Sequence, residues 1–355
     1  MKRWMALLLT AAVAAALLAG CSSGEKEEKT ETTPAVSSGS GSGSAVAEFE
    51  TQTWKFATSG TENSNWMMAA KYFGDLVNKE TNGAVTIEYY PSDQLTDGNQ
   101  SDGVQALIEG DVDISLHSNL IYASFDPRFN VVSLPFLFDS TEDADAKLQD
   151  GDGGKELKNI LEENGLHCMG IGENGFRNVT NSQHEIATLA DMKGLKMRVA
   201  ASALMNRTYE LWGAVPENAN WPEVYTSLKT GKFDGQENPL PIANASSIQD
   251  TQKYLTYWNA TYDCLFFCMN KDLYDSLSSD LRSIVDECGQ KAMEYQRQTN
   301  REEDAQILAD WQSKGIVVTR PTAEALQQFK DAAQPCWSEF EDELTPKLVS
   351  AFTGK

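Results

Sequence analysis

Apolar positions follow two rhythms from about residue 53 to the C-terminus. Short apolar or alternating runs predict β-strands over 54–58, 84–90, 112–116, 166–172 and 194–199. Apolar residues spaced three or four apart predict helices over 65–78, 104–108, 157–163, 203–212 and 223–229. Strands that alternate with helices in this way are typical of α/β layers around mostly parallel sheets.

One segment, 279–315, breaks this alternation. Its apolar stripe consists of Leu281, Ile284, Val285, Cys288 and Ala292. No proline and only one glycine, Gly289, interrupt the segment before Gly315. The pattern predicts one long helix that braces more than one lobe of the molecule.

The strand over 194–199 contains the residue on which the functional hypothesis depends. Alternation places Leu195, Met197 and Val199 on one face, and Lys196 and Arg198 on the other. An arginine within such a strand either reaches the surface along its own stem or lies buried beside an anion. A guanidinium matches a carboxylate through two parallel hydrogen bonds. We therefore expect Arg198 to bind the acid group of a small ligand; a structural ion pair is the alternative.

Composition narrows the classes of partner. The 355 residues include 41% hydrophobic positions, enough for a sizeable core, and carry a net charge of −23. So acidic a chain is unsuited to nucleic acid and to anionic membrane surfaces. An anion site in this protein must therefore be a local positive spot.

The N-terminus predicts export. Lys2 and Arg3 precede an apolar run that ends in Leu18-Ala19-Gly20-Cys21, which resembles a bacterial lipobox. Residues 1–20 are then a lipoprotein signal peptide, Cys21 is lipidated, and 21–52 are a lipid anchor and flexible linker. The predicted location is extracytoplasmic, either lipid-anchored to the outer face of the cell membrane or periplasmic.

Catalytic, metal and cofactor motifs find no support in the sequence. The Gly170–Gly175 stretch matches GxGxxG, but strand residues follow it instead of the helix that holds a pyrophosphate. His117, His167 and His184 lack metal-ligand spacing, and no nucleophile elbow occurs. We therefore predict no enzyme, no cofactor and no metal.

Five cysteines remain after Cys21. Cys264 and Cys268 would share one face of a strand about 13 Å apart, too far to pair with each other. Together with Cys168 they are expected to be small buried hydrophobes. Because exported proteins fold under oxidising conditions, a disulfide that involves Cys288 or Cys336 is a second alternative.

Several motifs carry a family resemblance. They stand in the order Pro135–Phe138, Gly175–Asn178, Asp191–Val199, Glu223–Tyr225 and Asp234–Pro239. Together they resemble the DctP-type substrate-binding proteins of tripartite ATP-independent periplasmic (TRAP) transporters. The resemblance runs from about Thr53 to the C-terminus.

This resemblance implies an α/β, two-lobed clamp with mixed sheets and a long interlobe helix. Lobe I comprises 53–174 plus 264–304, and lobe II comprises 175–263 plus 305–355. The implied function is an extracytoplasmic receptor that binds a small organic acid and delivers it to membrane subunits of a TRAP transporter. No cofactor and no nucleic acid are implied.

The resemblance also assigns residues. Arg198 matches the arginine that pairs with the ligand carboxylate, Arg177 a second arginine that supports or contacts it, and Asn238 an amide at the same end. Trp221 stands where the family often has phenylalanine. Contacts with the distal end of the ligand are implied for Ser59, Asn63, Asp97, Ser118 and Asn119. Ser118 stands where sialic acid receptors carry an acid, which favours a different hydroxylated acid, such as a uronate.

Three other interpretations stay open at this point. An ABC-type binding lipoprotein would have short hinge crossovers without the 279–315 helix. A surface-anchored sugar-acid enzyme would need a base, for which His117 is the candidate. A scaffold or adhesion lipoprotein would have no closed small-molecule cavity.

Overall fold

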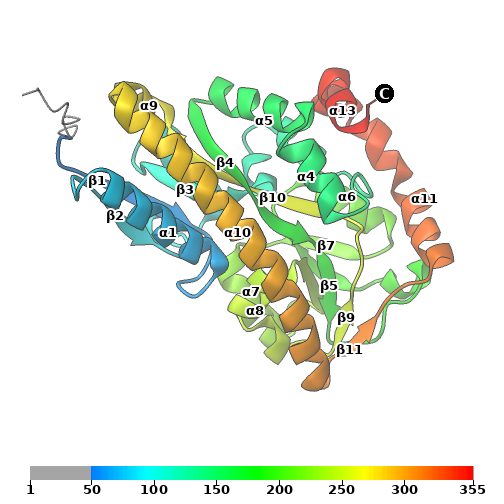
Figure 1. Ribbon diagram of the computed structural model, residues 1–355. Helices are drawn as coiled ribbons and strands as arrows, with labels where there is room; N and C mark the ends of the chain where they lie inside the picture. The colour runs from blue at the N-terminus through cyan, green and yellow to red at the C-terminus, as the bar shows by residue number, and fades with distance from the viewer. Residues whose placement is uncertain (1–48, 355) are drawn as a thin grey trace, which may run out of the picture. The chain divides into compact units, whose positions relative to one another are not determined.

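The computed structural model describes residues 49–354, which form two mixed β-sheets flanked by helices (Figure 1). The predicted signal peptide, the lipidation site Cys21 and nearly all of the predicted linker lie outside the described residues. None of the helices within 49–354 combines the length and the apolar character needed to cross a bilayer.

The first sheet has five strands. In spatial order they are β2 (Val85–Tyr90), β1 (Gln52–Thr58), β3 (Ile114–Ser118), β10 (Tyr262–Asn270) and β4 (Leu166–Phe176). β1 runs parallel to β2 and β3, whereas β10 runs antiparallel to β3 and β4. The return of the chain as β10 makes this sheet mixed, which confirms the mixed sheets that the family resemblance implied. The alternation of strands and helices had not by itself revealed this antiparallel strand.

The second sheet has six strands. In spatial order they are β11 (Val317–Thr319), β9 (Tyr254–Thr256), β5 (Asn178–Asn181), β8 (Gly235–Asn238), β6 (Lys196–Val199) and β7 (Val215–Asn218). β6 runs parallel to β7 and β8, whereas β5 runs antiparallel to β8 and β9. The chain passes from one sheet to the other directly between β4 and β5, and again between β9 and β10.

Helices cover both sheets. They are α1 (Asn65–Glu80), α2 (Gln100–Glu109), α3 (Asn119–Tyr122), α4 (Thr141–Leu148), α5 (Asp152–Glu163), α6 (Ala203–Leu211), α7 (Trp221–Lys229), α8 (Leu240–Ala245), α9 (Lys271–Ser276), α10 (Ser279–Ser313), α11 (Ala323–Glu339), α12 (Glu341–Leu344) and α13 (Pro346–Thr353). Short 3₁₀ turns are η1 (Gln94–Thr96), η2 (Pro127–Ser133), η3 (Leu189–Met192) and η4 (Ile248–Asp250).

The predicted long helix is confirmed as α10, which has 35 residues. Figure 1 shows it running diagonally past the first sheet towards the strands of the second, and it contacts α1, β4 and α8. Two glycines let it lie directly on β4. A Cβ on Gly170 would come within 2.8 Å of Met293, and one on Gly289 within 2.6 Å of Met169. Gly170 therefore serves helix packing in this fold.

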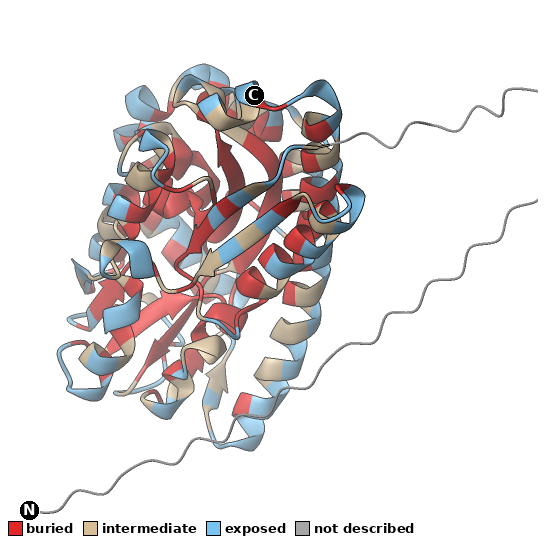
Figure 2. Ribbon diagram, turned by 90° about the vertical axis from the view of Figure 1, so that its left-hand side faces the viewer, coloured by how far each residue is buried: buried red, intermediate tan, exposed pale blue. Residues whose placement is uncertain are grey.

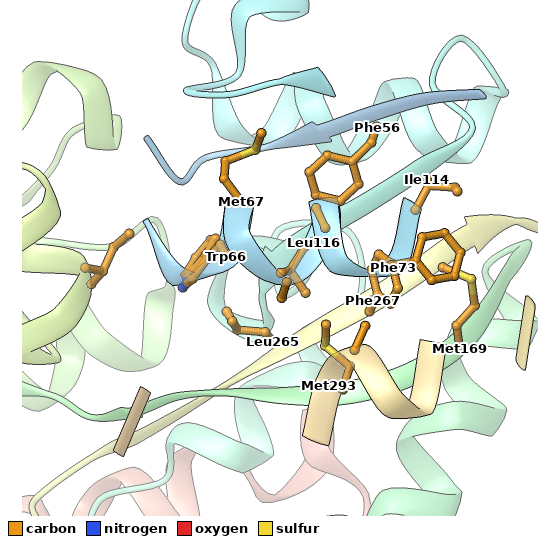
Figure 3. Close-up of a cluster of buried hydrophobic side chains, with 14 of the residues drawn as sticks. Phe56, Trp66, Met67, Phe73, Ile114, Leu116, Met169, Leu265, Phe267 and Met293 are labelled. Atoms are coloured by element: carbon orange, nitrogen blue, oxygen red, sulfur yellow. The ribbon is translucent and has the colours of Figure 1, made fainter. Parts of the chain in front are cut away.

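The core under α1 and α10 is apolar and aromatic (Figure 3). Phe73 of α1 packs edge-to-face on Phe267 of β10, with ring centroids 4.9 Å apart. Phe56 and Leu116 extend this layer from the parallel strands. Figure 2 shows the result: the strands are mostly buried, and the helices expose their outer faces. Burial of such side chains contributes about 1.5–3 kcal/mol each.

The C-terminal helices contact both parts of the fold. On α11, Phe329 packs against Trp212 and Trp258 beside the second sheet, whereas α13 packs on α5 beside the first. The proposed lobe boundaries, 53–174 plus 264–304 and 175–263 plus 305–355, are not decided by these contacts and stay a prediction.

Candidate ligand-binding cavity

A small cavity lies where segments attached to both sheets meet. Its volume is about 30 Å³. The lining residues are Ser59, Trp66, Gln100, Ser118, Ile121, Asn174, Arg177, Arg198, Ala200, Trp221, Asn238 and Ile242. The two arginines are among the most deeply buried large side chains of the described chain.

Arg198 lies on β6 and is only 2% exposed. Its Nε and Nη2 donate to the carbonyl oxygen of Ala219, at 2.9 and 2.6 Å. Among residues 49–354, no carboxylate lies within salt-bridge distance of this guanidinium. Burial, together with the nearby charge of Arg177, lowers the pKa of Arg198 to about 10 although Glu237 raises it. A buried cation without a counter-ion is costly, and a bound anion would remove that cost.

Arg177, between β4 and β5, is paired within the protein. Its guanidinium donates to the carboxylates of Glu237 and Asp263, and also to the Glu237 carbonyl oxygen at 2.9 Å. Burial disfavours the charged form, but these two carboxylates outweigh it and raise the pKa of Arg177. Asp263 also accepts hydrogen bonds from Ser118 and Asn174, each at 2.8 Å. Arg177 therefore has the surroundings of a structural ion pair at the wall of the cavity.

Trp221 and Asn238 complete this end of the cavity. Trp221 begins α7, and the Arg198 guanidinium lies 5.4 Å from its ring centroid. Its indole Nε1 is buried and has no hydrogen-bond partner in the described part of the chain. Asn238 ends β8 and donates from Nδ2 to Gln236 at 2.9 Å.

The opposite wall is polar and uncharged. Gln100 donates from Nε2 to Ser59 Oγ at 3.1 Å and accepts from the Trp221 backbone N–H at 2.9 Å. The Oδ1 atom of Asn174 is buried without a partner among the described residues. Gln100 and Asn174 were not predicted from the sequence. Asn174 directly precedes the Gly175–Asn178 motif, which is the one signal that pointed to it.

Three predicted contacts lie outside this set of lining residues. Asn63 and Asp97 are exposed, and Asp97 takes a left-handed turn conformation with φ 51°. Asn119 is buried, but its amide donates to Phe129 and Ser133 and accepts from the Cys264 N–H. The structure thus gives Asn119 a structural role behind the cavity.

His117 does not line the cavity either. It is fully buried on β3, with Nε2 2.8 Å from Asp93. This position does not favour the enzyme interpretation, which needed His117 as an accessible base. Within residues 49–354, no group of three or more His, Cys, Asp or Glu side chains is placed to hold a metal.

Larger hollows lie next to the β4–β5 and β9–β10 crossings, with volumes of about 770 and 390 Å³. The first has aromatic walls and two cations, Arg320 and Lys330, which are exposed. Exposed cations are solvated and need no ligand anion. The small cavity is the stronger candidate because its charged group is desolvated.

Two lobes of mixed sheet, crossing strands between them and a buried arginine at their junction define a solute-binding clamp. The chain belongs to the bacterial extracellular solute-binding protein family 7, whose DctP family model matches residues 56–343.

Named relatives agree with this membership. The 2,3-diketo-L-gulonate-binding periplasmic protein YiaO of Escherichia coli is 32% identical over 75% of this chain and 80% of its own length. A TRAP periplasmic solute-binding protein from Ralstonia eutropha, solved with bound (S)-2-acetolactate, superposes with a TM-score of 0.82. It is 29% identical over 85% of this chain and 98% of that chain.

The sugar acid binding protein DctPAm from Advenella mimigardefordensis, solved with galactonate, also has a TM-score of 0.82. It is 28% identical over 86% of this chain and 97% of that chain. The protein is thus an extracytoplasmic solute receptor of the TRAP type. The comparisons fit this interpretation and not the ABC-type alternative.

Proposed function

We propose that this receptor binds a small hydroxylated monocarboxylate, with Arg198 as the residue that holds the acid group. The observation that carries the proposal is the burial of Arg198 without a carboxylate partner in the described chain. Its Nε and Nη2 are occupied by one backbone carbonyl, so Nη1 is available to the ligand. Asn238 and the ring of Trp221 assist at the same end.

A single acid group fits the cavity better than two. Both lining cations lie beside Glu237, at one end. The remaining polar lining residues, Ser59, Gln100, Ser118 and Asn174, carry no positive charge. A second carboxylate would therefore be desolvated without a counter-charge. The ligands of three relatives, namely 2,3-diketo-L-gulonate, (S)-2-acetolactate and galactonate, are monocarboxylates and support this choice.

Two buried atoms favour a hydroxyl group on the ligand. Trp221 Nε1 is a donor and Asn174 Oδ1 an acceptor, and both lack partners in the part of the chain that is described. A hydroxyl group accepts one hydrogen bond and donates another. A hydroxy acid would therefore satisfy atoms that an unsubstituted acid leaves unpaired.

In the proposed cycle the protein acts by binding alone and has no catalytic activity. The ligand makes contacts from both lobes, which biases the clamp towards its closed form. Membrane subunits of a TRAP transporter then receive the ligand, and lipidated Cys21 with the 21–52 linker keeps the receptor near them.

Isothermal titration with galactonate, erythronate and succinate tests the proposal. We expect the two hydroxylated monocarboxylates to bind more tightly than succinate. Arg198→Ala should weaken that binding by at least about 30-fold, since removing one partner of a buried charge pair costs about 2–5 kcal/mol. Arg207→Ala, which removes an exposed arginine paired with Glu339, is the matched control and should change binding less than twofold. Equal binding by wild type and Arg198→Ala would refute the role of Arg198.

A further inference from the structure

Two buried cysteines lie opposite each other on neighbouring strands. β4 and β10 run antiparallel, and their register pairs Cys168 with Cys268 beside a β-bulge. Directly opposed residues of antiparallel strands point to the same face, with Cα atoms about 4.5–5.5 Å apart. A disulfide spans Cα separations of about 4.4–6.8 Å. Residues paired in this register therefore fall within the range of Cα spacings that a disulfide requires.

The two thiols also influence each other's ionisation. A hydrogen bond with the Cys268 thiol lowers the pKa of Cys168, while burial raises that of Cys268. Both lie in one apolar cluster beneath α5 and the C-terminal helices. Among residues 49–354 the remaining thiols are placed differently: Cys264 faces Glu173 across the strands, Cys288 lies on α10 and Cys336 on α11.

We propose that Cys168 and Cys268 form a cross-strand disulfide when the protein folds outside the cytoplasm. The thiolate of one cysteine attacks a sulfur of an oxidant disulfide and expels a thiolate, giving a mixed disulfide. The second cysteine, once deprotonated, attacks the mixed disulfide and expels the other half of the oxidant. The pair loses two electrons and two protons, and the oxidant becomes two thiols. Extracytoplasmic compartments supply such disulfides.

The bond would act on the strand pair that carries the Arg177 ion pairs. Arg177 directly follows β4, and Asp263 lies near the start of β10, opposite Gly175. The cross-link closes a loop of about 100 residues, a length for which loss of unfolded-chain entropy is large. The disulfide therefore stabilises the folded lobe and fixes the register of the two strands that lead to the cavity.

Peptide mapping of the wild-type protein tests the proposal. The chain is refolded in a buffered mixture of glutathione and glutathione disulfide, unfolded without reductant, alkylated with iodoacetamide and digested with chymotrypsin. Cleavage after Phe266 or Phe267 separates Cys264 from Cys268. We expect the Cys168 and Cys268 peptides to be joined, and the other three cysteines of the described chain, Cys264, Cys288 and Cys336, to be alkylated. Adding reductant should lower the melting temperature by about 4–10 °C.

Serine variants give the controls. Cys264→Ser should keep both the linked peptide and the sensitivity of the melting temperature to reductant, whereas Cys168→Ser and Cys268→Ser should lose both. Alkylation of all five described cysteines without reductant, or a bridge to any other cysteine, would overturn the proposal. The mapping uses the wild-type chain, so the result does not depend on whether a variant folds.

Discussion

At the residue scale, one nitrogen atom distinguishes Trp221 from the phenylalanine that the resemblance leads one to expect. Trp221→Phe keeps a ring beside Arg198 and removes the unpaired Nε1 donor. We expect affinity for a hydroxy acid to fall about tenfold, since one hydrogen bond is worth roughly 0.5–1.5 kcal/mol. Affinity for the corresponding deoxy acid should be unchanged. Titration of both acids into both proteins measures the difference; equal losses would show that the ring matters and the nitrogen does not.

The two arginines of the cavity should respond differently to substitution. Arg177→Met leaves Glu237 and Asp263 buried without their partner, so we expect a loss of about 3–5 kcal/mol of unfolding free energy. Urea unfolding measures this loss. Arg207→Met removes an exposed ion pair and should cost less than about 1 kcal/mol. If Arg177→Met were as stable as Arg207→Met, the ion pairs of Arg177 would not stabilise the fold.

The cavity residues differ in how well the sequence could predict them. Arg198 stood out because a strand pattern placed a cation where few cations are tolerated. Gln100 and Asn174 did not, because amides occur in any loop and their position depends on how two lobes meet. Asn63 and Asp97 do not line the cavity, for a related reason. A position in the loop after a strand does not determine the direction in which the loop points its side chains.

At the element scale, His167 links three elements. The imidazole of this β4 residue contacts Glu162 of α5 at 2.9 Å and Asp286 of α10 at 2.7 Å, and it stacks on Tyr274. Burial lowers the pKa of His167, but the hydrogen bonds with these two carboxylates outweigh burial and raise it above its ordinary 6.5. The folded state thus holds a proton that the unfolded chain releases near pH 6.5.

This linkage predicts a pH-dependent stability. The contribution of His167 is fully present below about pH 6.5 and is lost as the pH rises through the higher folded value. Urea unfolding at several pH values should show this loss in the wild type. In His167→Gln the free energy of unfolding should depend less on pH. His184→Gln, at an exposed histidine, is the control and should follow the wild type. Identical profiles for wild type and His167→Gln would contradict the prediction.

Individual elements were easier to predict than their arrangement. Periodicity located α1, β1 and α10 because each has a long, regular apolar pattern. It did not reveal that β10 returns antiparallel between β3 and β4, since pairing partners are chosen by tertiary packing. The glycine pattern around Gly170 resembled a nucleotide loop in sequence, and only the proximity of Met293 shows its packing role.

At the scale of the whole molecule, closure depends on contacts between segments far apart in sequence. Gln100, at the start of α2, accepts from the backbone N–H of Trp221, at the start of α7. Next to it, a Cβ on Gly98 would lie 3.4 Å from Pro222. These contacts join the two walls of the cavity. They should be broken whenever the clamp opens to admit or release a ligand.

Gln100→Ala should therefore destabilise the closed form without touching Arg198. We expect ligand dissociation to accelerate about tenfold, corresponding to one lost hydrogen bond, with association little changed. Stopped-flow tryptophan fluorescence measures both rates. Gln105→Ala, on the exposed side of the same helix, is the control. The hydrogen bond between Gln100 and Trp221 forms only after the two walls have met, so its loss should change the dissociation rate. If only the association rate fell, Gln100 would instead guide entry of the ligand.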